Sequence, residues 1–176
     1  MKRPTNGFTL IELMIALSLF AILVLLALPS YSSFMANTHI RNAAENSLNG
    51  VRLAQTTAIK GNNLAKFELN GIAGWTVSRW NDETAAFAPV QTYQFAEGAA
   101  QSISAPTPAG ATKVTFDGLG RVVPDASSIA LINVTNPSVA NSRNLRLVIS
   151  AVGGVSTQIK LCDPHVTDTS DPRICP

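Results

Sequence analysis

An apolar run near the start of the chain dominates its hydrophobic pattern. Residues 8–28 are all apolar or small apart from two hydroxyl residues and one charged residue, Glu12. As a helix this run would be about 31 Å long, which matches the apolar thickness of a bilayer. Lys2 and Arg3 precede it and favour a cytoplasmic amino terminus, with the rest of the chain outside. The pattern therefore predicts one membrane-spanning helix.

The helical pattern continues beyond this run. Pro29 falls where the run ends, and a proline within a helix removes one backbone hydrogen bond, so we expect a kink there rather than an end. Gly61 and the two asparagines after it supply a stop signal. One helix of about 80 Å is predicted over residues 8–60, and its second half, residues 29–61, is amphipathic. The positions expected on its packed face are Phe34, Thr38, Ala44, Leu48, Val51, Gln55, Ala58 and Ile59.

Beyond residue 63 the chain changes character. Short runs rich in Val, Ile, Thr, Phe and Trp alternate with Gly, Pro, Asn and Asp, which is typical of an antiparallel β domain. Residues 82–89 and 105–111 are interpreted as loops, and Gly118 and Gly120 as parts of a hairpin turn. We expect an α+β chain in which the long helix packs on a β domain covering residues 62–176. The predicted strands are 64–69, 75–80, 91–95, 102–104, 113–116, 128–133, 145–149 and 155–161.

Composition and charge narrow the function. Charged residues make up 14% of the chain, well below the usual quarter. The formal net charge of +2 becomes zero if residues 1–7 are removed, because Lys2 and Arg3 are lost with them. Net charge therefore does not indicate a strongly basic nucleic-acid binder. The length suits one globular domain with one appended segment.

Both cysteines, Cys162 and Cys175, lie near the carboxyl end. The segment between them is polar and rich in Asp and Pro, so it packs poorly unless its ends are tied. A disulfide would stabilise the fold by about 3 kcal/mol and requires an oxidising compartment; two free thiols are the alternative. His165 alone cannot complete a four-ligand zinc site with these cysteines, so no metal is expected.

No pattern in the chain favours catalysis. His39 lies on the predicted helix and His165 in the cysteine loop, and neither belongs to a recognisable nucleophile pattern. The run of Gly118, Leu119 and Gly120 lacks the third glycine and the following helix of a dinucleotide loop. We expect a protein that is not an enzyme and needs no cofactor.

Glu12 is the unusual residue of the apolar run. A carboxylate inside a bilayer helix costs about 3 kcal/mol on insertion scales and normally marks a functional site. We therefore expect a partner that compensates its charge. The alternative is that Glu12 lies close enough to the interface to be hydrated and needs no partner.

The residues around Glu12 match a known processing signal. Residues 7–13 read GFTLIEL, and Gly7, Phe8 and Glu12 stand at the spacing of the prepilin signature of type IV pilins and type II secretion pseudopilins. A secretory signal peptide would instead be cut after its apolar run, behind small residues, and the residues around Pro29 fit that pattern poorly. The chain thus resembles a type IV prepilin.

This resemblance implies the type IV pilin fold and a set of residue roles. A prepilin peptidase would cut between Gly7 and Phe8, which makes residues 1–7 a leader peptide, and the new amino group of Phe8 would be methylated. In the pilin family that amino group, from the same or a neighbouring subunit, is the partner of the carboxylate at the position of Glu12. Residues 8–28 would be the transmembrane half of the helix.

Further runs narrow the resemblance within the family. The tail between Cys162 and Cys175 resembles the pilus members more than the secretion members. Taken together, these runs of the chain resemble the GspH/FimT family, which comprises minor pseudopilins of type II secretion and minor pilins of the FimT and FimU type. The matching runs are the helix end at 51–60, GWTV at 74–77, TFDGLGR at 115–121 and LRLVIS at 145–150.

One basic stretch is a candidate binding site. Residues 142–161 contain no acid. Some FimT proteins bind DNA during natural transformation through a carboxy-terminal glycine-arginine motif, and this chain has GGVS at 153–156, without the arginine pair. DNA binding by phosphate neutralisation is one interpretation, and solvated strand positions are the other. The basic residues concerned are Arg143, Arg146, Lys160 and Arg173.

The expected function is that of a minor pilin of a type IV pilus, incorporated in the fibre or priming its assembly. Its partners would be other major and minor pilins, contacted through the amino-terminal helix, together with the prepilin peptidase and the inner membrane. The chain would start as a single-pass inner-membrane protein with a periplasmic carboxy-terminal domain, and would enter a pilus or pseudopilus on assembly. A minor pseudopilin of type II secretion and a DNA-binding minor pilin are the alternatives.

Overall fold

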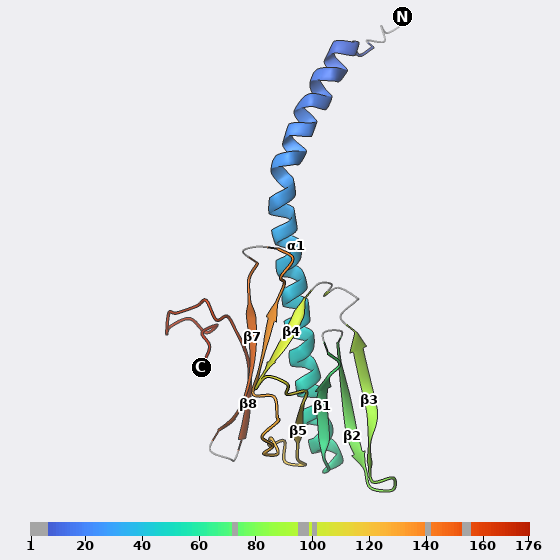
Figure 1. The fold of residues 1–176 in the computed structure, drawn as a ribbon, viewed down its shortest axis with the longest axis vertical. Helices are drawn as coiled ribbons and strands as arrows, with labels where there is room; N and C mark the ends of the chain where they lie inside the picture. The colour runs from blue at the N-terminus through green and yellow to red at the C-terminus, as the bar shows by residue number, and fades with distance from the viewer. Residues whose placement is uncertain (1–6, 72–73, 95–98, 100–101, 140–141, 153–155) are drawn as a thin grey trace, which may run out of the picture.

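A long helix and two β-sheets make up the fold. The computed structural model describes residues 7–71, 74–94, 99, 102–139, 142–152 and 156–176. Helix α1 (Leu10–Gly61) begins near the amino terminus, and its first half extends far beyond the β domain (Figure 1). It passes through Pro29 without a break and is curved along its length; a kink at Pro29 itself stays a prediction. The α+β architecture expected from the sequence is confirmed.

Local hydrogen bonds set both ends of α1. Thr9 is the N-cap residue, and its hydroxyl oxygen accepts a hydrogen bond from the N–H of Glu12 at 3.3 Å. At the other end Asn62 adopts a left-handed conformation with φ of 43°, and its N–H reaches the carbonyl oxygens of Ala58 and Ile59. The helix therefore begins two residues later and ends one residue later than predicted.

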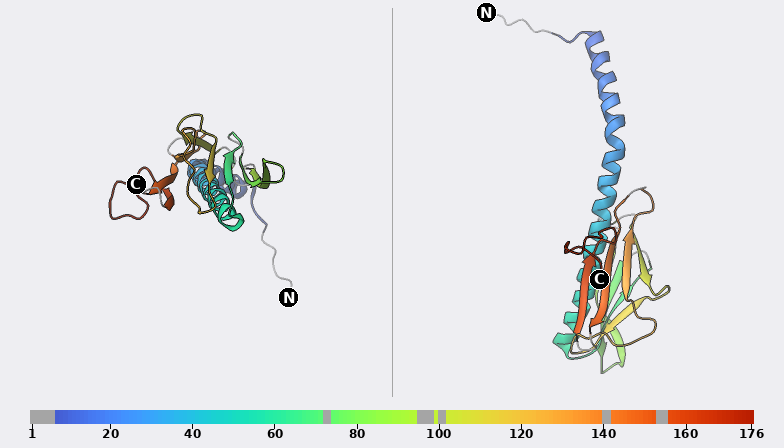
Figure 2. Two further views of the ribbon diagram at one scale, coloured as in Figure 1. Left: turned by 90° about the horizontal axis from the view of Figure 1, so that it is seen from below. Right: turned by 90° about the vertical axis from the view of Figure 1, so that its left-hand side faces the viewer.

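The strands form two antiparallel sheets beside the lower half of α1. The first sheet has the order β3-β2-β1-β5 and the second β4-β6-β7-β8. Figure 2 shows both sheets on one side of the helix. The strands are β1 (Ala65–Leu69), β2 (Gly74–Asn81), β3 (Ala86–Gln94), β4 (Ile103–Thr107), β5 (Lys113–Phe116), β6 (Leu131–Thr135), β7 (Leu145–Val152) and β8 (Ser156–Cys162).

Several strand ends differ from the prediction. Residues 86–89 and 105–107, interpreted as loop, belong to β3 and β4. Each of these segments contains a proline, Pro89 or Pro106, and both strands lie at sheet edges, where a missing N–H can be tolerated. Residues 128–130, predicted as strand, precede β6. The predicted strand ends at 95 and 155 lie outside the described residues.

One stripe of α1 packs against both sheets. The predicted face was partly wrong, because Phe34, Thr38 and Ile59 are exposed. The buried positions follow three- and four-residue steps on a neighbouring face, and nearly all carry small side chains, which lets the strands approach the helix closely. They are Ala36, Ile40, Ala43, Ala44, Ser47, Gly50, Val51, Ala54 and Ala58.

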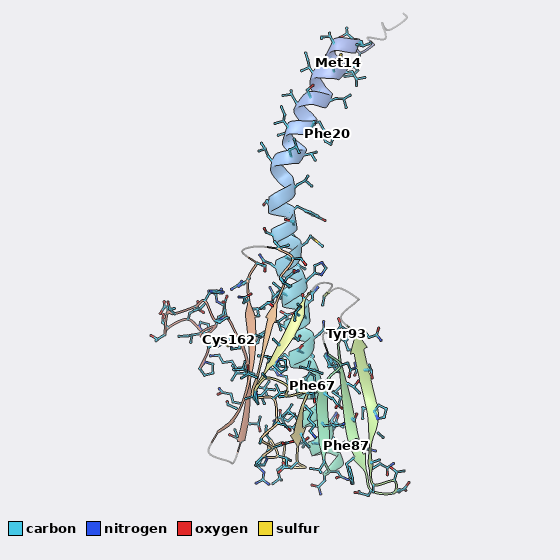
Figure 3. The ribbon with its side chains drawn as sticks, in the orientation of Figure 1. Met14, Phe20, Phe67, Phe87, Tyr93 and Cys162 are labelled. Atoms are coloured by element: carbon cyan, nitrogen blue, oxygen red, sulfur yellow. A yellow bond between two sulfur atoms is a disulfide. The ribbon has the colours of Figure 1, made fainter. Side chains whose placement is uncertain are left out.

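Aromatic side chains of the first sheet fill the space opposite Gly50. Trp75 stacks on Tyr93 at a centroid distance of 5.6 Å and lies 5.9 Å from the ring of Phe67. A Cβ atom at position 50 would lie only 2.7 Å from Cε2 of Trp75 and 2.8 Å from Cε2 of Phe67. The absence of a side chain at Gly50 is therefore a packing requirement of this core, in which Phe67 is labelled in Figure 3.

The predicted hairpin turn closes against the end of α1. Phe116 and Val122 form an antiparallel bridge around it. The side-chain amide of Gln55 donates a hydrogen bond to the carbonyl oxygen of Gly120 at 2.9 Å. Gly120 has a φ of 76°, and a Cβ atom there would lie 2.7 Å from Ile59 Cδ1. The glycine thus serves both the turn and its close approach to the helix.

We predict that Gly50→Ala lowers the free energy of unfolding of residues 36–176 by about 2 kcal/mol, because the new methyl group overpacks the core. This loss would exceed the gain of about 1 kcal/mol that alanine brings to a helix. The neighbouring Asn49 is exposed, so Asn49→Ala is the matched control and should leave stability unchanged or raised. Urea unfolding measures both, and equal stability of Gly50→Ala and the parent would refute the packing requirement.

Candidate assembly site

The first half of α1 is covered by no other element of the described structure. By length and composition this helix could cross a membrane, and its most apolar window has no buried residue. Large apolar side chains such as Phe20 and Leu26 are 63% and 72% exposed. Met14 and Phe20 project from the helix far from the β domain (Figure 3). An apolar surface of this size requires lipid or other apolar helices around it.

Glu12 lies in the first turn of this exposed helix. The Thr9 hydroxyl accepts the N–H of Glu12 and donates to the Oε2 atom of Glu12 at 3.5 Å. Among the described residues no Lys or Arg side chain forms an ion pair with Glu12. Within the described residues the charge of this carboxylate is therefore not compensated, and its predicted role in assembly stays a prediction.

The carboxyl-terminal tail is tied as predicted. Cys162 and Cys175 form a disulfide, with their Cα atoms 5.1 Å apart. Inside the loop the N–H of Asp163 donates a hydrogen bond to the carbonyl oxygen of Arg173 at 2.9 Å. Asp163 itself is almost fully buried at the base of the loop. The tail is thus fixed at both ends to the end of β8.

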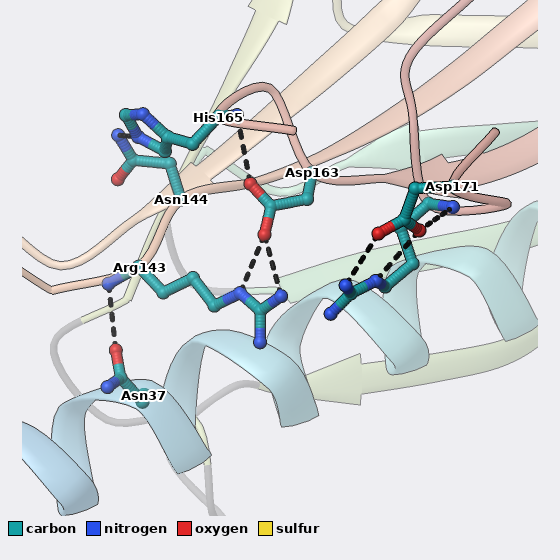
Figure 4. A network of polar contacts seen from close by, with 7 residues as sticks. Asn37, Arg143, Asn144, Asp163, His165 and Asp171 are labelled. Atoms are coloured by element: carbon teal, nitrogen blue, oxygen red, sulfur yellow. Dashed lines mark hydrogen bonds and ion pairs between the residues drawn. The ribbon is translucent and has the colours of Figure 1, made fainter. Parts of the chain in front are cut away.

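An ion pair joins this tail to the rest of the domain (Figure 4). Nε and a terminal nitrogen of Arg143 both lie 2.7 Å from one carboxylate oxygen of Asp163. The N–H of His165 donates to the other oxygen at 3.0 Å. The backbone N–H of Arg143 donates in turn to the side-chain oxygen of Asn37 on α1 at 2.7 Å. A continuous polar chain therefore runs from the helix through Arg143 to the tail.

These bonds determine the protonation of Asp163. Its burial alone would raise the pKa, but hydrogen bonds from His165 and Arg143 and the positive charge of Arg143 outweigh burial and hold the pKa of Asp163 below its usual value. Asp171, which accepts hydrogen bonds from Arg173, has its pKa lowered to about 2. Both groups are carboxylates at neutral pH.

The four basic residues singled out in the sequence do not form one patch. Arg143 and Arg173 line a hollow of about 330 Å³ between α1 and the tail, where each pairs with a carboxylate. Arg146, whose Nε donates to the side chain of Asn133, and Lys160 lie on the other face of the second sheet, away from its buried side chains. DNA binding through these residues stays a prediction.

Sequence reasoning missed the connection between Asn37 and Arg143. The two residues are separated by 106 positions, and neither stands in a recognisable motif. The buried face of α1 was also missed in part, but the sequence contains a signal for it, because alanines recur from Ala36 to Ala58 at the spacing of a closely packed helix face.

Comparisons with known proteins agree with this geometry. A model of the prokaryotic N-terminal methylation motif matches residues 2–28, and a model of the type II transport protein GspH matches residues 43–153. The crystal structure of the type IV minor pilin FimU from Pseudomonas aeruginosa strain PAO1 has a similar fold, with a TM-score of 0.52 at 18% identity over 72% of this chain and 92% of that one. No curated protein matches the sequence significantly.

A methylation motif on an exposed apolar helix, followed by this α+β domain, defines a type IV pilin-like protein. More narrowly, the chain belongs to the GspH family, whose model covers well over half of its length. Both minor pilins and pseudopilins fall within this description.

We predict that Asp163→Asn destabilises the domain by about 2 kcal/mol at neutral pH, because it removes a buried charge-assisted hydrogen-bond acceptor. Since the pKa of Asp163 is lowered in the fold, its carboxylate stabilises the protein above its ordinary pKa of about 4, and this contribution disappears as the pH falls through the lowered value. The difference from the parent should therefore shrink on acidification.

Urea unfolding at pH 7 and in acid measures this difference. Glu83→Gln is the control, because Glu83 is exposed and its carboxylate forms no hydrogen bond with the described residues. A pH-independent difference for Asp163→Asn would show that its charge is not what stabilises the tail.

Proposed function

We propose that this chain is a minor pilin of a type IV pilus, incorporated in the fibre or priming its assembly after cleavage between Gly7 and Phe8. The observation that carries the proposal is the exposed apolar half of α1 with Glu12 in its first turn. Lipid can cover this surface before assembly, and the helices of other pilins can cover it afterwards. The shared fold with a type IV minor pilin supports a place in a pilus.

The free energy of moving α1 from lipid into a fibre depends on Glu12. Covering one Leu, Ile or Phe side chain is worth about 1.5–3 kcal/mol against water, in lipid or in a fibre. Exchanging lipid for other helices therefore changes the hydrophobic term little, and close packing and polar pairing decide the direction. A carboxylate costs about 3 kcal/mol in a bilayer, and the amino group of a processed Phe8 would compensate that charge in the fibre.

The proposed topology follows from the two ends of the chain. Lys2 and Arg3 would hold the leader in the cytoplasm until the prepilin peptidase removes it. The β domain would stand in the periplasm, where the disulfide between Cys162 and Cys175 is stable. Cleavage would then leave a methylated Phe8 at the head of the helix.

We predict that Glu12→Ala leaves cleavage intact but lowers incorporation into fibres about tenfold, which corresponds to losing about 1.4 kcal/mol of pairing. The measurement is an immunoblot of sheared fibres and of whole cells from a complemented deletion strain. Gly7→Ala is the contrasting variant, because it should block cleavage and leave the full-length band. Normal incorporation of Glu12→Ala would sink the proposed pairing.

A minor pseudopilin of type II secretion is the first alternative. It is favoured by the family model, which is named for a type II transport protein. Deletion of the gene separates the two functions, since the loss of a minor pilin reduces surface pili while the loss of a pseudopilin reduces the secretion of exoproteins.

DNA binding is the second alternative, and Arg146 and Lys160 on one face of the second sheet favour it. This alternative predicts that residues 36–176 retard duplex DNA at low salt, and that each phosphate contact adds about −0.9 to the salt slope of the binding constant. The double variant Arg146→Ala, Lys160→Ala should then bind more weakly than Arg52→Ala, which removes an exposed arginine of α1. An absence of retardation at protein concentrations on the order of tens of micromolar would exclude this function.

A further inference from the structure

The two sheets of the described structure end in edge strands, which are β3 and β5 in the first sheet and β4 and β8 in the second. Along an edge, every second residue turns its backbone N–H and carbonyl away from the sheet. These groups can pair with another chain, so proteins usually block or cover their sheet edges. The state of each edge therefore shows where this domain can accept a further strand.

A proline blocks the edge at β3. The N–H of Trp80 in β2 donates to the carbonyl oxygen of Leu64, on the side of β1. The preceding residue, Arg79, therefore turns toward β3 and bonds to its partner Ala88. The next residue of β3 is Pro89, whose ring nitrogen faces outward and has no hydrogen to donate. The pairing of β2 with β3 is also shifted next to Pro89, which distorts this edge further.

The second sheet repeats this device at β4. The N–H of Ile149 in β7 donates to the carbonyl oxygen of Ala130, on the side of β6. Two residues earlier, Leu147 turns toward β6 as well and bonds to its partner Ile132. Because Ile132 turns toward β7, its partner in β4, Pro106, faces outward. The missing N–H of this proline is again on the free edge.

A later segment of the chain covers the edge at β5. The N–H of Ile129 donates to the carbonyl oxygen of Lys113, and the N–H of Val123 donates to that of Thr115, both at 2.9 Å. Lys113 and Thr115 are the residues of β5 that turn away from β1. The outward carbonyl groups of this edge are thus already occupied.

The edge at β8 has neither a proline nor a covering segment among the described residues. Since Ile149 turns toward β6, the residue before it, Val148, turns toward β8 and bonds to its partner Lys160. The residues that alternate with Lys160 therefore turn their backbone groups outward, and no described residue forms a backbone hydrogen bond with them there. They are Thr157, Ile159 and Leu161.

Two hollows open along the edge of β8. One of about 330 Å³ lies between α1 and Leu161, and another of about 370 Å³ lies beside Thr157. The Thr157 hydroxyl accepts the N–H of Val122 at 3.1 Å, which fixes the wall of the second hollow. Between them, Ile159 and Leu161 pack against the core but are only partly buried. An added strand would find space, backbone partners and apolar contacts in one place.

Lys160 determines which kind of strand suits this edge. Its side chain lies on the face of the sheet opposite to Ile159, and it forms no ion pair with any described residue. A lysine on an edge strand discourages unspecific pairing, whereas a carboxylate directly across from it stabilises a pair of strands. A fitting strand therefore alternates apolar residues, on the side of Ile159 and Leu161, with polar residues that include an acid opposite Lys160.

We propose that β8 binds an extended segment of another protein chain, with an acid opposite Lys160, as an additional antiparallel strand. A second copy of β8 fits poorly, because its sequence STQIKLC has no acid. Antiparallel pairing of two copies would also reverse α1, which runs lengthwise beside β8 (Figures 1 and 2), so the two apolar half-helices would point in opposite directions. Strand binding does not depend on fibre assembly, and its failure would leave the proposed role as a minor pilin standing.

The test uses the full-length protein in micelles of lauryldimethylamine oxide and the fluorescently labelled peptide TVEVTVT. In antiparallel pairing its valines lie opposite Thr157, Ile159 and Leu161 and its glutamate opposite Lys160. We expect a saturable rise in fluorescence anisotropy that empty micelles do not produce. The peptide TVKVTVT should bind at least about threefold more weakly, as expected for one cross-strand charge pair, and Lys160→Glu should reverse this preference.

Ile159→Pro removes an N–H that faces outward and should weaken binding of TVEVTVT at least about tenfold. Ile159→Ala is the matched control, because it shortens the same side chain but keeps the N–H, and it should bind within about threefold of the parent. If Ile159→Pro fails to fold, the reversal by Lys160→Glu still decides the question.

The proposal is overturned if TVEVTVT shows no saturable binding up to about 1 mM. It is also overturned if Ile159→Pro binds as well as Ile159→Ala, or if Lys160→Glu keeps the preference of the parent. Light scattering of the protein without peptide tests the second copy as the occupant, and a dimer that Ile159→Pro dissociates would likewise refute the binding of another protein.

Discussion

The rest of the structure depends on the packing of one helical stripe, from Ala36 to Ala58, against two separate sheets. The strands of each sheet pair with one another, and α1 contacts strands of both sheets. The helix is thus the element that the two sheets share, and small side chains along it allow the close approach. The same helix carries the uncovered apolar surface at its other end. One element therefore supplies both the core of the domain and the surface through which the chain meets lipid or other helices.

Features encoded locally were predictable from the sequence. The long helix follows from its apolar run and stop signal, the disulfide from two cysteines at the ends of a polar segment, and the hairpin turn from Gly118 and Gly120. The strands were found through their β-branched and aromatic residues, although the predictions left out the parts of β3 and β4 that contain Pro89 and Pro106. A proline is compatible with an edge strand, and a sequence does not reveal which strands lie at an edge.

Features that depend on the tertiary arrangement could not be predicted. The helix face was misjudged because Phe34 and Ile59 fit an apolar pattern, whereas the tight approach of the sheets selects for small residues. The bond between Asn37 and Arg143 joins distant segments whose residue types are ordinary. A cleft of about 520 Å³ likewise lies between the end of α1 at Gly61 and the turn after β2, and only the fold brings these two segments side by side.

The continuity of α1 has a mechanical consequence. A single helix from Leu10 to Gly61, without a break, connects the anchoring segment to the β domain as a curved rod. If the first half of α1 packed against neighbouring helices in a register shifted by one residue, the attached domain would rotate by about 100° and move along the helix axis by about 1.5 Å. The rotation of the first half of α1 about its axis therefore determines which side of the β domain points outward. Tension along the helix would act as a shear force on the buried residues between Ala36 and Ala58.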